Sequence, residues 1–397
     1  MARGTPWAKL EFSARFQESL PGESSRREMA APLTDARVLD ALRPIVDPDF
    51  GKSIVDLGFV KDLRIDGGSV AFSIELTTPA CPVKAEFEKA ARERVAALPG
   101  VSSVSVTMTA NTRGRAASPN AEATPVLPGV RNTIAVASGK GGVGKSTIAV
   151  NLAIALRETG ARVGLMDADV YGPSLPLLTG VRGRPHAEQK RIFPQQGHGL
   201  SLMSMGFFVT ENSPVIWRGP MVHGLIRQFL TDVEWGELDY LVVDMPPGTG
   251  DAALTLTQQA PLAGAVIVTT ANDLSLIDAR KGLKMFEKVQ VPVLGIVENM
   301  SYFTPPDLPD RKYYLFGKGG GQRVAEELGV PFLGDVPIDP RVVEGGDQGR
   351  PILVHAPDSE AARAIREIAG KIARRLAVLA DSTPPLADAN ITWVSSP

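Results

Sequence analysis

The stretch that decides the fold of most of this chain is residues 133–147, which read TIAVASGKGGVGKST. An apolar run over 133–138 leads into a complete GxxxxGK[ST] phosphate-binding loop. The loop consists of Gly139, Lys140, Gly141, Gly142, Val143, Gly144, Lys145, Ser146 and Thr147. A helix is expected next, because apolar residues recur on one face until Gly160. This strand, loop and helix context predicts a nucleoside triphosphate site.

Each residue type in this loop serves phosphate binding. Glycines let the backbone wrap closely, so that several N–H groups point at phosphate oxygens. Lys145 is expected to bring positive charge to the β and γ phosphates, and Ser146 to offer its hydroxyl to Mg²⁺. The loop therefore predicts a Mg²⁺-nucleotide site in which Lys145 is catalytic.

Outward from the loop, short apolar runs alternate with helical segments. The runs are TIAVAS, RVGLMD, LSLMSM, YLVVD, AVIVTT, VLGIVEN and FLGDV. Continuous apolar runs indicate parallel strands that are buried on both faces. The pattern predicts an α/β domain with a doubly wound, mostly parallel sheet over residues 132–380, with a last helix over 359–379.

A smaller α+β unit is predicted ahead of this domain, over residues 33–110. Its order is αββαβ, with helices after Thr34 and over 83–98, and a hairpin turn at Asp66-Gly67-Gly68. The composition of the remaining segments predicts a linker over 111–131 and flexible tails over 1–32 and 381–397.

Composition excludes several classes of protein. With 42 Lys plus Arg against 44 Asp plus Glu, the net charge is −2, so no overall basic field attracts nucleic acid or a membrane surface. The chain has no apolar run of the length that spans a bilayer, and its only cysteine, Cys81, rules out an intramolecular disulfide. We expect a cytoplasmic protein with no nucleic-acid or membrane partner.

Polar side chains follow the predicted strands at the sheet edge where ligands bind. Asp167 and Asp169 follow one strand, Asp244 ends another, and Asn299 follows a third. Phosphoryl transfer needs one carboxylate near the metal and one that orients the attacking water. An amide at this edge can pair with a purine, although an asparagine there is usually a turn residue.

The second lysine of the loop, Lys140, resembles the deviant loop of the MinD, ParA and nitrogenase-reductase group of ATPases. The resemblance implies an ATP-sandwich homodimer in which Lys140 reaches the partner's nucleotide. It also implies that Asp169 orients water, that Asp167 and Asp244 lie near Mg²⁺, and that Asn299 contacts adenine. The alternative for Lys140 is a solvated surface residue.

Further motifs narrow the resemblance. The segments WRGPMVHGLIRQFL (217–230), DMPPGTGDAALTL (244–256) and VENMSYF (297–303), with the loop, resemble the Mrp/ApbC family of iron-sulfur cluster carrier or scaffold ATPases. Residues 33–110 resemble the small cluster-assembly domain of that family, through Asp47-Pro48-Asp49 and Thr78-Pro79-Ala80-Cys81-Pro82. The resemblance implies transfer of clusters to apoproteins.

One departure from the family limits the cluster site. Many members carry a Cys-x-x-Cys pair after the Asn-Met-Ser segment, whereas residues 302–321 here read YFTPPDLPDRKYYLFGKGGG. This resembles the cysteine-free branch of chloroplast and cyanobacterial members. A labile iron-sulfur cluster must then rest on Cys81 and on partner ligands, or the cluster role is lost. A lone cysteine is more often a small buried hydrophobe, but one placed before a helix is a candidate reactive thiol.

These observations predict a slow, switch-like Mg²⁺-dependent ATPase that dimerises around ATP and carries an iron-sulfur cluster to apoproteins. The rivals are a partition or positioning ATPase that acts on DNA or membrane, a regulatory ATPase without cluster binding, and an electron carrier, which would need two cysteines per subunit. The four histidines have no metal-ligand spacing.

Overall fold

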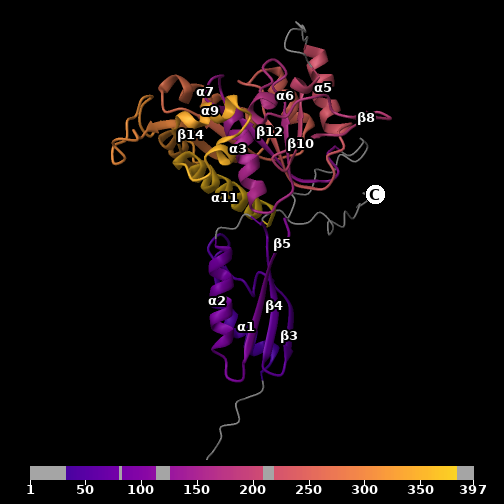
Figure 1. Cartoon of the computed structure of the whole chain (residues 1–397), viewed down its shortest axis with the longest axis vertical. Coiled ribbons are helices and arrows are strands. Elements are labelled where there is room, and N and C mark those ends of the chain that lie inside the picture. The colour runs from indigo at the N-terminus through magenta and orange to yellow at the C-terminus, as the bar shows by residue number, and fades with distance from the viewer. Residues whose placement is uncertain (1–32, 80–82, 113–125, 209–218, 382–397) are drawn as a thin grey trace, which may run out of the picture.

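The computed structural model describes residues 33–79, 83–112, 126–208 and 219–381. It has a small unit, drawn indigo to violet in Figure 1, and a larger unit built on a long twisted sheet. Cys81 lies outside the described residues.

The small unit has the predicted αββαβ order, with one addition. Its elements are α1 (Asp35–Leu42), β1 (Val46–Asp47), β2 (Lys52–Ser53), β3 (Val60–Asp66), β4 (Ser69–Leu76), α2 (Lys84–Ala96) and β5 (Ser103–Ala110). The predicted hairpin joins β3 to β4 antiparallel, and β4 pairs with β5 in parallel. The addition is the short β1–β2 pair. Helices α1 and α2 bury the apolar side of β4, whereas Ser103, Ser105, Thr107 and Thr109 on the opposite side of β5 are exposed.

The larger unit contains every strand that the apolar runs predicted. These strands are β6 (Val130–Ala137), β7 (Val163–Asp167), β11 (Leu200–Ser204), β12 (Leu238–Asp244), β13 (Leu262–Thr269), β14 (Val293–Phe303) and β15 (Phe332–Ile338). In the described chain they pair in parallel in the order β11-β7-β12-β6-β13-β14-β15, and β10 (Gln195–Gly197) adds an antiparallel edge. Two further short strands, β8 (Ala187–Glu188) and β9 (Arg191–Ile192), pair with each other.

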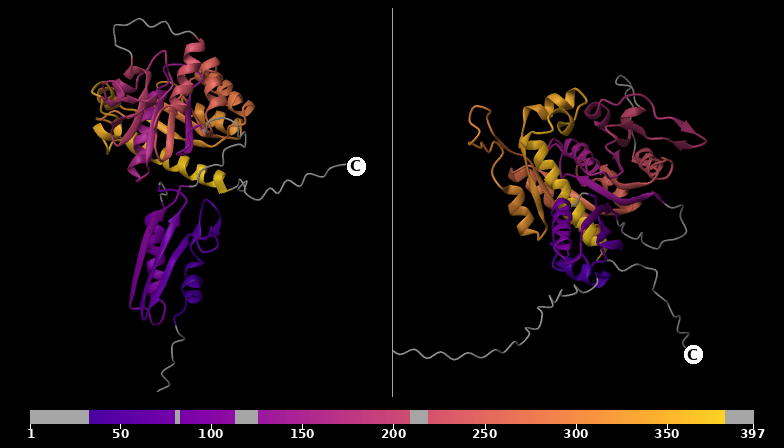
Figure 2. Two further views of the ribbon diagram at one scale, coloured as in Figure 1. Left: turned by 90° about the vertical axis from the view of Figure 1, so that its right-hand side faces the viewer. Right: turned by 60° about the horizontal axis from the view of Figure 1, so that its bottom comes forward.

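Helices cover both faces of this sheet, as the views in Figure 2 show. One face packs against α3 (Lys145–Glu158), α10 (Ile352–His355) and α11 (Glu360–Asp381). The other packs against α5 (Gly219–Thr231), α6 (Asp251–Gln259), α7 (Asp273–Lys288) and α8 (Gly320–Glu327). Along β6, Ile134 and Val136 enter the first core, whereas Ala135 and Ala137 enter the second. Because both faces are buried, the strands are continuous apolar runs.

Two element ends differ from the sequence-based expectation. Strand β6 begins at Val130, inside the expected linker, because Val130 pairs with Leu238 of the neighbouring strand. Strand β14 continues past Asn299 to Phe303, which pairs with Ile338. The remaining short helices are α4 (Leu175–Thr179), α9 (Pro340–Asp347) and a 3₁₀ turn over Met205–Phe207.

Candidate nucleotide site

The phosphate-binding loop joins the carboxyl end of β6 to the first turn of α3. Gly144 has φ of +78°, and a Cβ at this position would collide with the amide of Asn299. A Cβ on Gly139 would collide with the backbone of Asp278 in α7. Glycine is therefore required at both ends of the loop. Helix α3 begins directly after it, so the unpaired N–H groups of its first turn are available to phosphate oxygens.

At the start of α3, Lys145 contacts the carboxylate of Asp244 at the end of β12. Both side chains are buried, and the Lys145 ammonium also lies 3.3 Å from the Ser146 hydroxyl. The fold thus brings three of the predicted site residues, Lys145, Ser146 and Asp244, into contact beside the phosphate-binding loop.

Asp167, at the end of β7, is the second buried carboxylate of the site. Its Oδ2 accepts hydrogen bonds from the Ser204 hydroxyl at 2.9 Å and from the backbone N–H of Leu175 at 3.3 Å. Burial, and then the charge of Asp244, raise the pKa of Asp167 to about 7. Burial also raises the pKa of Asp244, and the nearby Lys145 opposes that rise. Two carboxylates beside one ammonium leave this region short of positive charge.

The oxygen donors here suit one ion in particular. Hydroxyl and carboxylate oxygens are the ligands that Mg²⁺ prefers, usually together with waters and substrate phosphates. Ser146, Asp167 and Asp244 form such a set, and a divalent cation would supply the missing positive charge. The residues present therefore fit Mg²⁺ together with a nucleotide.

Asp169 lies apart from the buried pair. It is half-buried, and its Oδ1 accepts a 3.2 Å hydrogen bond from the N–H of Gly172. It lines a cavity of about 320 Å³ between the turn that follows β7 and the Pro-Gly turn that follows β12. The cavity is also lined by Tyr171, Val222, His223, Pro246, Pro247, Gly250, Asp251, Ala252 and Ala253. A water in this cavity can reach the Asp169 carboxylate.

The side chains of Lys140 and Asn299 differ in their partners. Within the described ranges, the half-buried Lys140 side chain makes no hydrogen bond or ion pair, whereas its backbone carbonyl accepts from the Ser138 hydroxyl at 2.9 Å. Asn299 uses its Nδ2 to donate a 2.9 Å hydrogen bond to the carbonyl of Val143. Its amide therefore braces the loop, and the adenine contact stays a prediction.

Sequence reasoning missed three residues that shape the site. Ser138 ties the loop to the Pro-Gly turn, because its carbonyl accepts from the N–H of Gly248 at 2.9 Å. Ser204 in β11 is the register partner of Asp167 in the adjacent parallel strand β7. Glu298 accepts a 2.6 Å hydrogen bond from the N–H of Gly321 at the start of α8. Ser204 could have been found as the polar residue near the end of the apolar run 200–205.

The segment that lacks the family's cysteine pair joins β14 to α8. The ammonium of Lys312 in this segment lies 3.7 Å from the centre of the ring of Tyr302 in β14, and Tyr302 donates a 2.7 Å hydrogen bond to Glu360. In the part of the chain that the structure describes, no group of three or more His, Cys, Asp or Glu residues could hold a metal ion by itself. Likewise, the described helices include none long and apolar enough to cross a membrane.

Comparison with known proteins agrees with this architecture. A family model described as NUBPL iron-transfer P-loop NTPase matches residues 129–373, and one described as iron-sulfur cluster assembly protein matches residues 35–107. The iron-sulfur cluster carrier protein of Synechocystis sp. is 53% identical, over 88% of this chain and 99% of that protein. The chloroplastic Fe-S cluster assembly factor HCF101 of Arabidopsis thaliana is 50% identical, over 88% of this chain and 65% of that protein.

A solved structure shares both the fold and substantial sequence. The nucleotide-binding protein from Archaeoglobus fulgidus, in complex with ADP, is 40% identical with a TM-score of 0.52 and covers 59% of this chain and 91% of that chain. The resemblance that the motifs predicted is thereby confirmed at the level of family. The chain belongs to the NUBPL iron-transfer family of P-loop NTPases.

Proposed function

We propose that this chain is an ATP-dependent iron-sulfur cluster carrier that delivers clusters to apoproteins. The observation that carries the proposal is the joining, in one chain, of a buried Lys145–Asp244 phosphate-binding site with a domain that matches the cluster-assembly model over residues 35–107. We assign the small domain to 33–112 and the ATPase domain to 130–381, because β6 begins at Val130 and the Asn111 N–H bonds to the carbonyl of Leu76 at the end of β4. The lone cysteine favours a reducing compartment such as the cytoplasm.

In the nucleotide half, the loop residues Gly139 to Thr147 bind the phosphates through their N–H groups. Ser146, Asp167 and Asp244 would hold Mg²⁺, which would supply positive charge to the phosphates. When the nucleotide binds, the Lys145 ammonium leaves Asp244 and pairs with the phosphate oxygens. The Asp244 carboxylate is then free to bind a metal ion. Asp169 orients the attacking water. Hydrolysis is slow, because the nucleotide serves to set the conformation.

We further propose that ATP joins two copies of the chain. Lys140 is a catalytic residue that acts across the dimer on the partner's nucleotide. Its side chain has no bonding partner among the described residues of its own chain, which supports a role outside that chain.

The cluster is the cargo of this protein, and it is labile because the chain supplies fewer thiolate ligands than the cluster needs. Each chain offers one thiolate, that of Cys81, so a dimer offers two, whereas an all-cysteine cluster needs four. Small thiols, carboxylates or the recipient's own cysteines complete the set, and such ligands exchange readily. A cluster held in this way is suited to transfer.

Anaerobic reconstitution with iron and sulfide tests this proposal. We expect at most one cluster per dimer, lost readily to a chelator or to an apo-ferredoxin. In Cys81→Ala the cluster should be absent while ATPase activity persists. A full complement of iron and sulfide in Cys81→Ala would show that the site is wrong. If the wild type takes up no cluster, the proposal that this chain is a carrier is wrong and the regulatory ATPase becomes the better hypothesis.

A further inference from the structure

Two carbonyl groups of the phosphate-binding loop are held by side chains from outside the loop. Asn299 in β14 donates from its Nδ2 to the carbonyl of Val143 at 2.9 Å. Ser138, the residue directly after β6, donates from its hydroxyl to the carbonyl of Lys140 at 2.9 Å. Asn299 is 8% exposed and Ser138 is 2% exposed, so little water competes for these two donors.

Holding these carbonyls also sets the direction of two N–H groups. In a planar trans peptide, the C=O of one residue and the N–H of the next point in opposite directions. The bond to Val143 therefore turns the N–H of Gly144 away from Asn299, and the bond to Lys140 turns the N–H of Gly141 away from Ser138. Within the described ranges neither N–H donates a hydrogen bond, so both are available to a ligand.

The backbone of the loop has the conformation of an anion-binding turn at the same place. The φ angle is +82° at Gly142 and +78° at Gly144, whereas Val143 between them has a negative φ. Such an alternation brings successive N–H groups to one side of the chain, where they form a concavity for an anion. The peptide that Asn299 holds is the one between Val143 and Gly144, so its bond fixes this concavity.

The orientation of the Asn299 amide follows from its partner. A carbonyl oxygen only accepts hydrogen bonds, so the nitrogen end of the amide faces Val143. This bond serves the loop and not the base of a nucleotide. Donors that are held in place before the ligand arrives do not have to be reorganised when it binds. A brace on the loop should therefore favour any ligand with a chain of phosphates.

We propose that Asn299 and Ser138 are positioning residues that direct the N–H groups of Gly144 and Gly141 toward the phosphates of the nucleotide. The proposal rests on the nucleotide site of the proposed function and is independent of the cluster. Both side chains act through the backbone of the loop, so their effect does not depend on the base. A residue that contacts only adenine would affect ATP alone.

Three variants test the two braces. Asn299→Asp keeps the shape of the side chain, but an ionised carboxylate only accepts hydrogen bonds and repels the Val143 carbonyl. Burial raises the pKa of the new carboxyl, and its protonated form donates an O–H to that carbonyl. Asn299→Ala has neither a charge nor a donor. Ser138→Ala removes the hydroxyl that bonds to the carbonyl of Lys140.

Two control variants make the same exchanges where no brace is lost. Asn272→Asp adds the same charge after the neighbouring strand β13, but the Asn272 Oδ1 accepts a 2.9 Å hydrogen bond from the N–H of Ser275, which a carboxylate also accepts. Ser301→Ala removes a serine that is 1% exposed and bonds to Asp335. Thermal unfolding followed by circular dichroism shows that each variant is folded.

Calorimetry with cluster-free protein and Mg²⁺ measures the dissociation constants of ATP and of inorganic tripolyphosphate at pH 8 and pH 5.5. At pH 8, we expect Asn299→Asp, Asn299→Ala and Ser138→Ala to bind both ligands about tenfold more weakly than the wild type, and the controls to stay within about twofold. At pH 5.5, Asn299→Asp should recover most of its affinity relative to the wild type and bind more tightly than Asn299→Ala. That difference separates the return of a donor from the loss of a charge.

Several results would overturn the proposal. A loss that is confined to ATP in the Asn299 variants would make Asn299 a contact of the base only. Unchanged affinity in Ser138→Ala, equal losses in the controls, or equal binding by Asn299→Asp and Asn299→Ala at pH 5.5 would also contradict it. If the wild type binds neither ligand, the nucleotide site itself is wrong, which is a separate failure of the proposed function.

Discussion

The ammonium group of Lys145 lies against the carboxylate of Asp244, a residue 99 positions later in the chain, and the two side chains are only 6% and 5% exposed. A lysine at this position of the loop needs a counter-charge while no nucleotide is present, because an unpaired buried ammonium is strongly disfavoured. Asp244 supplies that charge. The pair thereby holds the Lys145 side chain at the base of the phosphate-binding loop.

Replacing Lys145 with alanine should abolish ATP hydrolysis and weaken nucleotide binding by about 100-fold or more, because the triphosphate loses its main cationic contact in a buried site. Binding is measured by calorimetry and turnover by phosphate release. Wild-type turnover in Lys145→Ala would contradict the assignment of the loop.

Lys140→Ala should retain ATP binding within about threefold, yet hydrolyse ATP slowly and fail to dimerise with a non-hydrolysable analogue, because the Lys140 charge acts on the partner's nucleotide. Size-exclusion chromatography with light scattering measures the dimer. Lys281→Ala, which removes an exposed lysine from α7, is the control. Normal hydrolysis in Lys140→Ala would show that Lys140 is a solvated surface residue with no role in catalysis.

Asp169→Asn should keep the affinity for Mg²⁺-ATP and lower turnover by about 100-fold, because the amide no longer orients the attacking water. Asp251→Asn changes the charge of the same cavity and should leave most of the activity. If the affinity of Asp169→Asn falls while turnover survives, the residue belongs to the metal site.

Binding of Mg²⁺-nucleotide should strengthen as the pH rises to about 7. The raised pKa of Asp167 means that the folded protein without ligand holds a proton there below about pH 7, and a metal ion binds only the carboxylate. Binding at pH 6 should then release up to one proton from Asp167, and binding at pH 8 almost none. Calorimetry in two buffers of different ionisation enthalpy measures the release.

Asp167→Asn provides the control, because it removes this proton and leaves the titration of the nucleotide itself. Equal proton release in the variant and the wild type would contradict the assignment. The same raised pKa has a consequence for folding. Since the folded state holds this proton more tightly than the unfolded chain, the Asp167 contribution to stability falls as the pH rises from about 4 to about 7.

The strands, the loop and the hairpin of the small domain were predictable because their signals are local. A parallel strand that is buried on both faces has to be a continuous apolar run, and each of those runs falls in a parallel strand of the sheet. The glycines of the loop are fixed by backbone geometry at single positions such as Gly144. The strand-end positions of Asp167 and Asp244 follow from the same runs.

The contacts between distant residues required the tertiary structure. Ser204 reaches Asp167 only because β11 and β7 are neighbours in the sheet, and strand order does not follow chain order here. Asn299 in β14 braces Val143 across 156 positions, although β13 lies between β14 and β6 in the sheet. A polar residue at the end of a strand shows which edge of the sheet it occupies, but its partner depends on which strand lies beside it.

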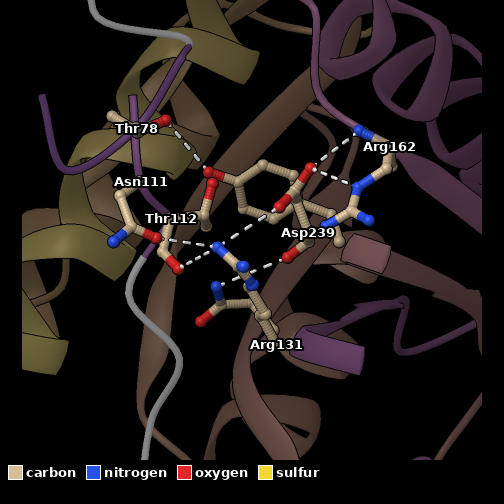
Figure 3. Close-up of polar contacts among 8 residues, drawn as sticks. Thr78, Asn111, Thr112, Arg131, Arg162 and Asp239 are labelled. Atoms are coloured by element: carbon tan, nitrogen blue, oxygen red, sulfur yellow. Dashed lines mark hydrogen bonds and ion pairs between the residues drawn. The ribbon is translucent and has the colours of Figure 1, made fainter. Parts of the chain in front are cut away.

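The sequence by itself determined that this chain joins a small αββαβ unit to a phosphate-binding α/β domain, because periodicity and glycine spacing act within one element at a time. Only the tertiary structure decided where the small unit lies. It lies at the edge of the sheet opposite the nucleotide site, where Thr78 shares a hydrogen bond with Tyr240 and Asn111 accepts one from Arg131 (Figure 3). The pairing of such side chains depends on the packed shapes of two complete domains.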